Sequence, residues 1–106
     1  MRQFAVYRNL GEHTRSLYPL LLNVQSDLID ETGTRVVVPM APVARGRHPP
    51  PISSLAPVLE VNGKPHVLVV PLLAATELAD LGAIEADLSR ERGTIMAALD
   101  LLISGI

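Results

Sequence analysis

The amino-acid sequence predicts a mainly β fold that ends in one α-helix, and three patterns lead to this prediction. Short segments rich in Leu, Val and Ile are interrupted by prolines, which favours antiparallel strands at the edges, bulges and bends of a small barrel or curled sheet. An Asn62-Gly63 dipeptide between two such segments is typical of a two-residue hairpin. Near the C-terminus the apolar residues change to a helical period.

The first three predicted strands lie in the N-terminal part of the chain. Gln3–Tyr7 alternates, so that Phe4 and Val6 share one face of the strand. Leu17–Val24 and Thr34–Met40 are longer and more apolar, and the residues between them include the turn formers that a reversal of the chain needs.

The two remaining predicted strands, Leu59–Val61 and Lys64–Val70, flank the Asn62-Gly63 turn. Before them, Arg45–Pro51 is basic and ends in consecutive prolines, which predicts an exposed loop.

The C-terminal helix is predicted over about residues 88–104. Its apolar face is formed by residues at intervals of seven, four, three and four positions: Leu88, Ile95, Leu99, Leu102 and Ile106. Asp87 or Ser89 suits the start of this helix, and Gly105 stands where a helix usually ends.

Length and composition exclude several classes of protein. A chain of 106 residues is expected to form one domain, residues 1–106. Nine basic and eleven acidic side chains give a net charge of −2, which disfavours direct nucleic-acid binding because that mode needs a basic face. The longest apolar run, Val67–Ala75, contains Pro71 and is too short to span a membrane. We therefore expect a soluble, cytoplasmic protein.

No arrangement of residues typical of catalysis is recognisable, which favours a binding protein over an enzyme and predicts no cofactor. Without cysteine there is no thiol nucleophile and no disulfide. His13, His48 and His66 are widely separated, so we interpret them as surface histidines. The acidic cluster within residues 27–31 supplies too few ligands for a cation and is interpreted as a solvated turn.

Two apolar features remain open to two interpretations each. The segment Ile103–Ile106 either docks onto the sheet or forms a contact surface at the end of the helix. The pair Leu28-Ile29, set in an acidic turn, is either a local core anchor or a contact surface.

Several segments, taken in their order along the chain, resemble the CcdB family of plasmid and chromosomal toxins. The resemblance covers nearly the whole chain and is weakest over residues 45–54. The segments that carry it are Gln3-Phe4, Val6-Tyr7, Val24–Asp30, Arg35–Met40, Ala86–Ser89 and Ser104–Ile106.

This resemblance implies a homodimer with an SH3-like antiparallel β-barrel, a small extra β-sheet and a C-terminal helix. It implies a toxin that binds the A subunit of DNA gyrase and traps the enzyme on cleaved DNA. A CcdA-like antitoxin with a disordered C-terminal segment would neutralise the toxin, and the toxin–antitoxin complex would repress its own operon, with the antitoxin contacting DNA.

Compared position by position, the resemblance also implies which residues make contacts. The residues that it implies in gyrase binding are Ile103, Ser104, Gly105 and Ile106. Those that it implies in contact with gyrase or the antitoxin are Leu28, Ile29 and Asp100.

The sequence departs from the family pattern at two positions. Ser104 stands where the best-known member of the family has a tryptophan that stacks on an arginine of the gyrase A subunit, a contact worth roughly 2 kcal/mol on the scale of interface hot spots. Asn23 replaces an aspartate that often precedes Val-Gln-Ser-Asp.

Two alternative functions stay open at this point. One is an RNA-cleaving toxin of the related MazF/Kid type, although the Gly-Asp-Ile/Val and Arg-Pro motifs of those enzymes are absent here. The other is a degenerate, non-toxic CcdB homologue that only dimerises and binds antitoxin.

Overall fold

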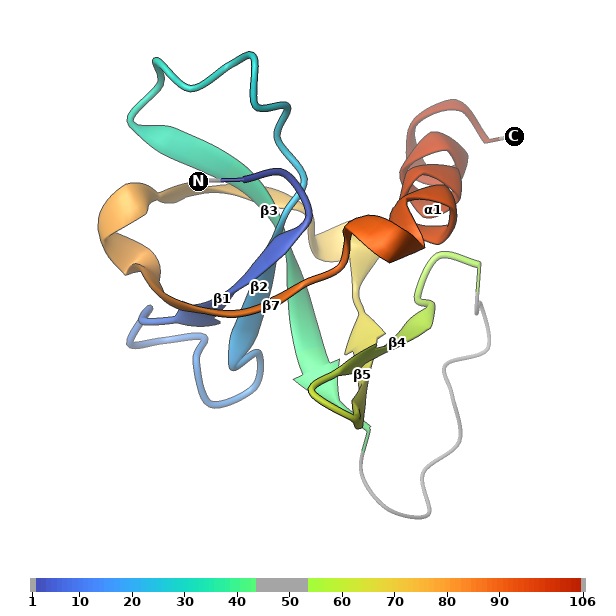
Figure 1. The fold of residues 1–106 in the computed structure, drawn as a ribbon, viewed down its shortest axis with the longest axis horizontal. Coiled ribbons are helices and arrows are strands. Elements are labelled where there is room, and N and C mark those ends of the chain that lie inside the picture. Colours follow the sequence, from blue (N-terminus) through green and yellow to red (C-terminus); the bar gives the residue numbers. More distant parts are fainter. Residues whose placement is uncertain (1, 44–53, 106) are drawn as a thin grey trace.

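The computed structural model describes residues 2–43 and 54–105 (Figure 1). It contains a helix, α1 (Arg92–Ser104), and three short 3₁₀ segments, η1 (Val70–Leu72), η2 (Leu78–Asp80) and η3 (Ser89–Glu91). The strands in chain order are β1 (Ala5–Asn9), β2 (Leu20–Asn23), β3 (Thr34–Pro42), β4 (Val58–Val61), β5 (Lys64–Leu68), β6 (Ala74–Glu77) and β7 (Leu81–Asp87). The predicted Arg45–Pro51 loop lies outside the described residues.

The strands form one curled antiparallel sheet in the order β4-β5-β3-β2-β1-β7, with β6 pairing separately with β3. The predicted class, mainly antiparallel β with one C-terminal helix, is confirmed. The curled sheet forms half of a barrel (Figure 1). β5 and β6 pair with successive parts of the same edge of β3.

Strand β3 exchanges its partner along one edge, and Pro39 lies at the exchange. Residues before it pair with β6, whereas Met40–Pro42 pair with β5. The carbonyl of Pro39 accepts a hydrogen bond from the N–H of Val69, so its ring nitrogen faces the same edge, between the two partners. A residue without an N–H fits this gap because no ladder donor is needed there.

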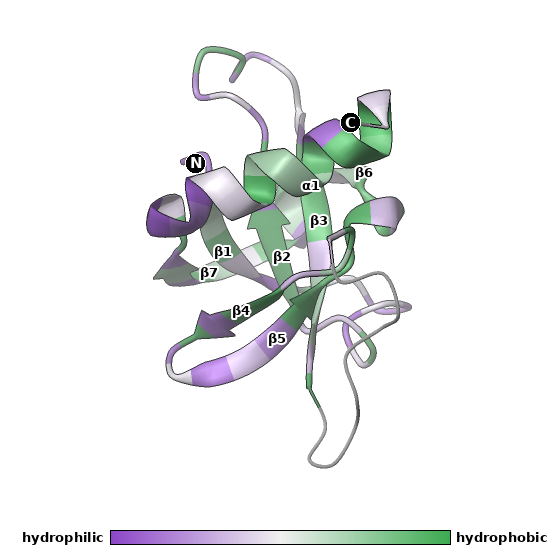
Figure 2. Cartoon of the chain, turned by 90° about the vertical axis from the view of Figure 1, so that its right-hand side faces the viewer, coloured by the Kyte–Doolittle hydropathy of each residue, from purple (hydrophilic) through white to green (hydrophobic). Residues whose placement is uncertain are grey.

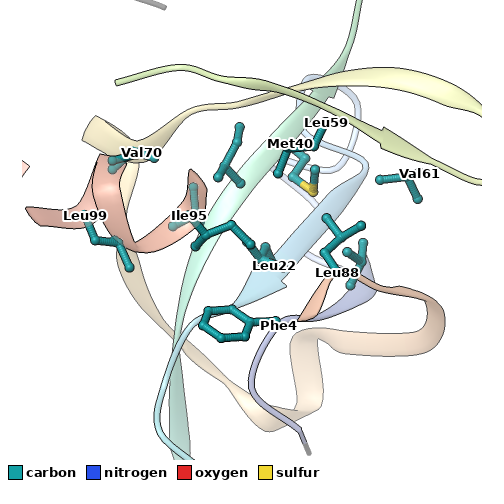
Figure 3. Close-up of a cluster of buried hydrophobic side chains, with 13 residues drawn as sticks. Phe4, Leu22, Met40, Leu59, Val61, Val70, Leu88, Ile95 and Leu99 are labelled. Atoms are coloured by element: carbon teal, nitrogen blue, oxygen red, sulfur yellow. The ribbon is translucent and has the colours of Figure 1, made fainter. Parts of the chain in front are cut away.

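The hydrophobic core lies between α1 and the concave face of the sheet (Figures 2 and 3). Ile95, fully buried, is the helix residue at its centre, and Ala98 and Leu99 flank it. The core is completed by residues of the strands, η1 and the approach to α1: Phe4, Val6, Leu22, Val38, Met40, Leu59, Val61, Leu68, Val70 and Leu88.

The alternation predicted for the first strand is confirmed, but both of its faces are buried. Phe4 and Val6 lie in the core under α1. Ala5 and Tyr7 belong to a second, smaller cluster with Leu21, Val37 and Leu81. Because neighbouring residues of a strand point to opposite faces, this second cluster lies on the face of the sheet that α1 does not cover.

The Asn62-Gly63 hairpin is confirmed. Both residues have positive φ, 52° and 80°, as a two-residue turn of this type requires. Val61 pairs with Lys64 directly across the turn.

The predicted strand Leu17–Val24 is too long, because β2 begins only at Leu20. The preceding residues form turns, with the N–H of Leu17 and that of Tyr18 bonded to the carbonyl of Thr14. The buried Asn9 side chain stabilises these turns by donating to Thr14 Oγ1 and to the Tyr18 carbonyl. A tertiary contact from β1 therefore overrides the local strand preference.

The ends of two other predicted strands shift as well. β1 starts after Phe4, which has a positive φ of 67° and turns the chain. β5 stops at Leu68, because η1 follows with Pro71 in its first turn. The structure also contains β6 and β7, which the sequence analysis did not predict.

The helix begins later than predicted. The predicted range of about 88–104 starts with η3, and α1 itself runs over Arg92–Ser104. Glu91 has φ −96° and ψ 16°, outside the helical region, which separates the two segments. Asp87 accepts a hydrogen bond from the N–H of Ser89, the first residue of η3, at 2.8 Å, and among the described residues it makes no bond to α1.

We predict that Ile95→Ala destabilises the protein by about 2–5 kcal/mol, because Ile95 is fully buried between α1 and the sheet. Urea unfolding followed by circular dichroism measures this loss. The matched control is Ile29→Ala, the same truncation at a side chain that is 55% exposed, which is expected to cost less than about 1 kcal/mol. Equal losses for the two variants would contradict this account of the core.

We also predict that Asp87→Asn removes part of the acid dependence of stability. Hydrogen bonding from the side chain and then the backbone of Ser89, together with the charge of Arg2, lowers the pKa of Asp87 below its ordinary value of 3.8. A lowered folded-state pKa contributes stability that is present above the unfolded-state pKa and is lost as the pH falls through the folded-state pKa. The free energy of unfolding, measured at pH 7 and at successively lower pH values, should therefore fall less steeply for the variant than for the wild type. An unchanged dependence on pH would refute this role of Asp87.

Candidate functional site

The C-terminal end of α1 is an exposed apolar tip. Gly105 has a φ of 74° and its N–H bonds to the Leu101 carbonyl at 3.0 Å, which ends the helix as predicted. Ile103 is 80% exposed and Leu102 is 38% exposed. The interpretation that Ile103 docks onto the sheet is therefore wrong. Ile106, the last predicted contact residue, lies outside the described residues.

Ser104 and Asp100 are one helical turn apart at this tip, and both are exposed. The Ser104 hydroxyl donates a hydrogen bond to the Asp100 carbonyl at 2.7 Å. The hydroxyl is thus bonded back onto its own helix, a common arrangement for serine in a helix. Because Ser104 is exposed, a larger side chain at this position would project into solvent.

The predicted contact pair Leu28-Ile29 lies on the loop between β2 and β3, and it is not a core anchor. Leu28 is 90% exposed and Ile29 is 55% exposed. Two adjacent exposed aliphatic side chains are costly to leave in water, which is typical of a surface that a partner covers.

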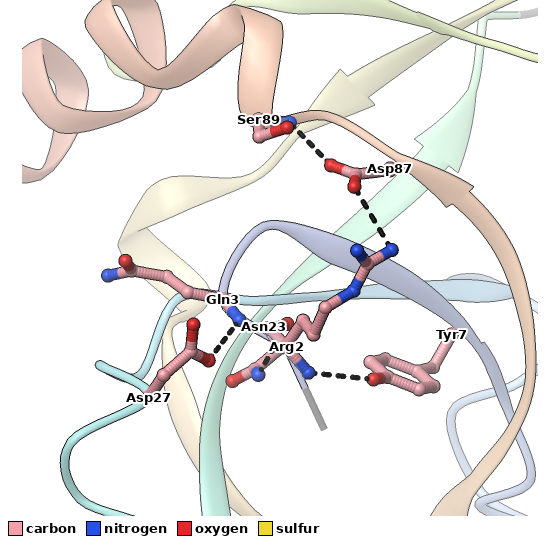
Figure 4. A network of polar contacts seen from close by, with 7 residues as sticks. All are labelled: Arg2, Gln3, Tyr7, Asn23, Asp27, Asp87 and Ser89. Atoms are coloured by element: carbon pink, nitrogen blue, oxygen red, sulfur yellow. Dashed lines mark hydrogen bonds and ion pairs between the residues drawn. The ribbon is translucent and has the colours of Figure 1, made fainter.

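The N-terminal segment connects this loop to the start of α1 (Figure 4). The backbone N–H of Gln3 donates to the Asp27 carboxylate at 2.7 Å, and its side-chain amide donates to the Val24 carbonyl at 3.1 Å. On its other side, Gln3 Oε1 accepts a bond of 3.5 Å from Arg92. One short segment therefore links the Leu28-Ile29 loop to the first turn of α1.

Gln3 and Arg92 were not among the contact residues that sequence reasoning selected. The two residues are 89 positions apart, and no local pattern links them. Arg92 also lies over the ring of Phe4, 5.4 Å from its centroid, which fixes the first turn of α1 against the N-terminal segment. The polar surface between loop and helix thus comes from tertiary structure alone.

Arg2 extends the same network to the approach to α1. Its guanidinium forms an ion pair of 3.1 Å with Asp87, and its backbone N–H donates to the Tyr7 hydroxyl at 3.2 Å. Asp87 in turn accepts from the N–H of Ser89 (Figure 4). Arg2 and Asp87 are both exposed, so solvent screens this ion pair and it adds little to the stability of the fold.

Asn23, one of the two departures from the family pattern, is fully buried and cannot touch a partner. Its side-chain amide donates to the Arg2 carbonyl at 2.9 Å, and its side-chain oxygen accepts from the N–H of Gln25 at 3.1 Å. An ionised aspartate accepts but does not donate, so asparagine suits both bonds. This position therefore holds the N-terminal segment in place.

The second face of the sheet has a hollow of about 230 Å³. Buried Leu21 and Val37 line it, together with exposed Leu72 of η1 and Ala74 of β6. η1 also contacts α1, so this apolar face continues toward the C-terminal helix. In size and lining, the hollow suits the apolar side chains of another protein surface.

The interpretation of all three histidines as surface residues is wrong for His66, which is 7% exposed. Its Nδ1 lies 2.9 Å from the Lys64 carbonyl oxygen, which can only accept a hydrogen bond from that nitrogen. His13 is exposed, as expected, and His48 lies outside the described residues.

Within residues 2–43 and 54–105, the structure brings together no three His, Cys, Asp or Glu side chains that could bind a metal ion. Over the same residues, no helix is long and apolar enough to cross a membrane. The candidate site consists of exposed apolar side chains, with polar groups beside the Leu28-Ile29 loop, which is the composition of a protein-recognition surface.

Comparison with known protein families shows to which family this chain belongs. The model of the family described as "CcdB protein" matches residues 3–105, which covers all seven strands, the helix and both groups of predicted contact residues up to Gly105. A match over nearly the entire chain shows that this protein belongs to the CcdB family, the toxins of toxin–antitoxin systems.

Proposed function

We propose that this toxin binds the A subunit of DNA gyrase and traps the complex of gyrase with cleaved DNA. The observation that carries the proposal is the exposed apolar tip of α1, where Ile103 is 80% exposed. The resemblance to the CcdB family implies gyrase binding at this position. Leu28 and Ile29 provide a second contact with gyrase or with the antitoxin, and Asp100 adds a charged group beside the tip.

This mechanism needs no chemistry from the toxin. The toxin has only to bind one conformational state of gyrase better than the others, because preferential binding shifts the population toward that state. The bonds to DNA are made and broken by gyrase. In this proposal the toxin is a binding protein, without catalytic residues, cofactor or metal.

A homodimer fits both the target and the shape of the toxin. The apolar second face of the sheet, with Leu72 and Ala74 exposed around the hollow, would be covered by the same face of a second copy. A two-fold pairing presents two identical C-terminal tips, which suits a two-fold symmetric target.

The remaining partner is a CcdA-like antitoxin in the cytoplasm. A disordered antitoxin segment would bind the exposed contacts of the toxin and displace gyrase. The toxin has a net charge of −2, so the antitoxin would supply the contacts of the repressor complex with operator DNA.

We predict that deletion of Ile106 abolishes gyrase poisoning and leaves the dimer intact, because the tip contacts gyrase while the sheet supports the fold. The purified wild type and the deletion variant are each incubated with gyrase, supercoiled plasmid and ATP, and the amount of linear DNA is measured after denaturation and protease treatment. Light scattering reports the mass of the variant. A truncated protein that still produces linear DNA would refute the role of the tip.

A second candidate function is a non-toxic homologue that dimerises and binds antitoxin only. The observation that favours it is Ser104, which replaces the stacking tryptophan of the family and bonds back to the Asp100 carbonyl. This candidate predicts that the wild-type protein binds antitoxin and produces no linear DNA with gyrase.

We predict that Ser104→Trp strengthens binding to the gyrase A subunit by about 30-fold, equivalent to ~2 kcal/mol, by restoring a stacked indole. Ser104 is exposed, so the larger side chain fits without displacing the core. Titration calorimetry measures the affinity, with Ser104→Ala as the control for loss of the hydroxyl. An unchanged or weaker affinity for Ser104→Trp would show that this toxin docks on gyrase in a different way.

A further inference from the structure

The loop that carries Leu28 and Ile29 has a defined shape without any apolar anchor. Residues 27–33 are all exposed, so burial of their side chains does not hold the loop in place. Leu28 and Ile29 themselves point into solvent. Its shape must come from polar contacts, and two side chains provide most of them.

Gln25 spans the base of the loop from inside. Its Nε2 donates to the Ile29 carbonyl and to Thr32 Oγ1, the latter at 3.3 Å. Its Oε1 accepts from the N–H of Val36 at 3.0 Å, which ties the loop to β3. These contacts require one group that both donates and accepts, which is what a side-chain amide offers.

Arg35 supports the second half of the loop and is itself 6% exposed. Its guanidinium donates to the carbonyls of Asp30, Thr32 and Thr34, at 3.4, 3.0 and 2.8 Å. Among the described residues no carboxylate forms an ion pair with it. A buried guanidinium needs hydrogen-bond partners, so its burial commits these three carbonyls to point inward.

The first half of the loop is fixed by its own turn. Ser26 accepts from the N–H of Leu28 through its hydroxyl at 3.1 Å, and from the N–H of Ile29 through its carbonyl at 3.0 Å. With the Ile29 carbonyl bonded to Gln25, both backbone groups of Ile29 are occupied on the protein side. The side chains of Leu28 and Ile29 are left outside.

We propose that Gln25 and Arg35 are positioning residues that hold Leu28 and Ile29 in the conformation in which they bind a partner. This inference rests on the proposed contact of Leu28 and Ile29 with gyrase. A loop that is already ordered pays less conformational entropy on binding. Without these bonds, only a fraction of molecules presents the pair correctly, and the apparent Kd rises by the inverse of that fraction.

The test is Gln25→Glu, a substitution of nearly the same shape. A carboxylate still accepts from Val36 but no longer donates to the Ile29 carbonyl, and it places two oxygens against each other. We expect amide hydrogen exchange at Leu28 and Ile29 to become about tenfold faster, with the strands of the sheet unchanged. We expect the association rate with the gyrase A subunit to fall about tenfold, with the dissociation rate unchanged, because fewer molecules are competent to bind.

Two further variants separate positioning from charge and from direct contact. Gly33→Glu adds the same charge to the same loop, at a position where a side chain meets nothing within 4 Å, and should bind as the wild type does. Leu28→Ala with Ile29→Ala removes the contact itself and should raise the dissociation rate. Arg35→Lys keeps the charge but cannot reach three carbonyls, and should behave like Gln25→Glu.

A Gln25→Glu protein with wild-type exchange at Ile29, or with a wild-type association rate, would overturn the inference. So would a general increase of exchange across the sheet, which would indicate a purely structural role. If the double variant binds the gyrase A subunit as tightly as the wild type, or if the wild type does not bind it, the proposed contact itself fails. If instead the double variant binds weakly while Gln25→Glu binds normally, the proposed contact stands and only the positioning role of Gln25 fails.

Discussion

The backbone conformation of Phe4 is the constraint on which the rest of this structure depends. Its φ of 67° is unfavourable for a residue with a side chain, by about 1–3 kcal/mol, and persists only where the surroundings determine it. Its N–H bonds to the Asn23 carbonyl at the end of β2, and its carbonyl accepts from Leu88 before α1. Its ring is buried in the core under α1, below Arg92. One residue thereby joins the loop after β2, the first strand and the start of the helix.

This arrangement places the tip of α1 and the Leu28-Ile29 loop, the two contacts proposed for this toxin, on one folded frame. The tip of α1 is placed by the packing of Ile95 and Leu99 against the sheet, and the Leu28-Ile29 loop is placed by polar bonds from Gln25, Arg35 and Gln3. The exposed apolar side chains Leu28, Ile29 and Ile103 lie outside the core and are accessible at the surface. Because binding alone is proposed to stall the target, precise placement of these contacts replaces catalytic chemistry.

The two faces of the sheet are covered to different extents. The concave face buries the larger cluster of side chains against α1, whereas the opposite face carries a smaller cluster of five buried apolar residues and keeps Leu72 and Ala74 exposed around a hollow. The alternation of β1 already contains this division, since Phe4 and Val6 lie on one side and Ala5 and Tyr7 on the other. The two departures from the family pattern differ in the same way: Asn23 is buried and holds the N-terminal segment, whereas Ser104 is exposed within the proposed contact.

The sequence by itself determined the features that rest on local interactions. The Asn62-Gly63 turn, the helical face of Ile95 and Leu99 and the helix stop at Gly105 all depend on residues close in the chain, and each is found as predicted. β6 and β7 were missed because Ala, Gly, Asp and Glu have low strand propensity, so these strands form only by pairing with β3 and β1. Whether Leu28, Ile29 and Ile103 are core or surface was likewise decided by tertiary structure, because an aliphatic side chain carries no local signal of the contacts it will make. The buried positions of His66 and Arg35 have the same origin, since burial depends on residues that are distant in sequence and adjacent only in the folded sheet.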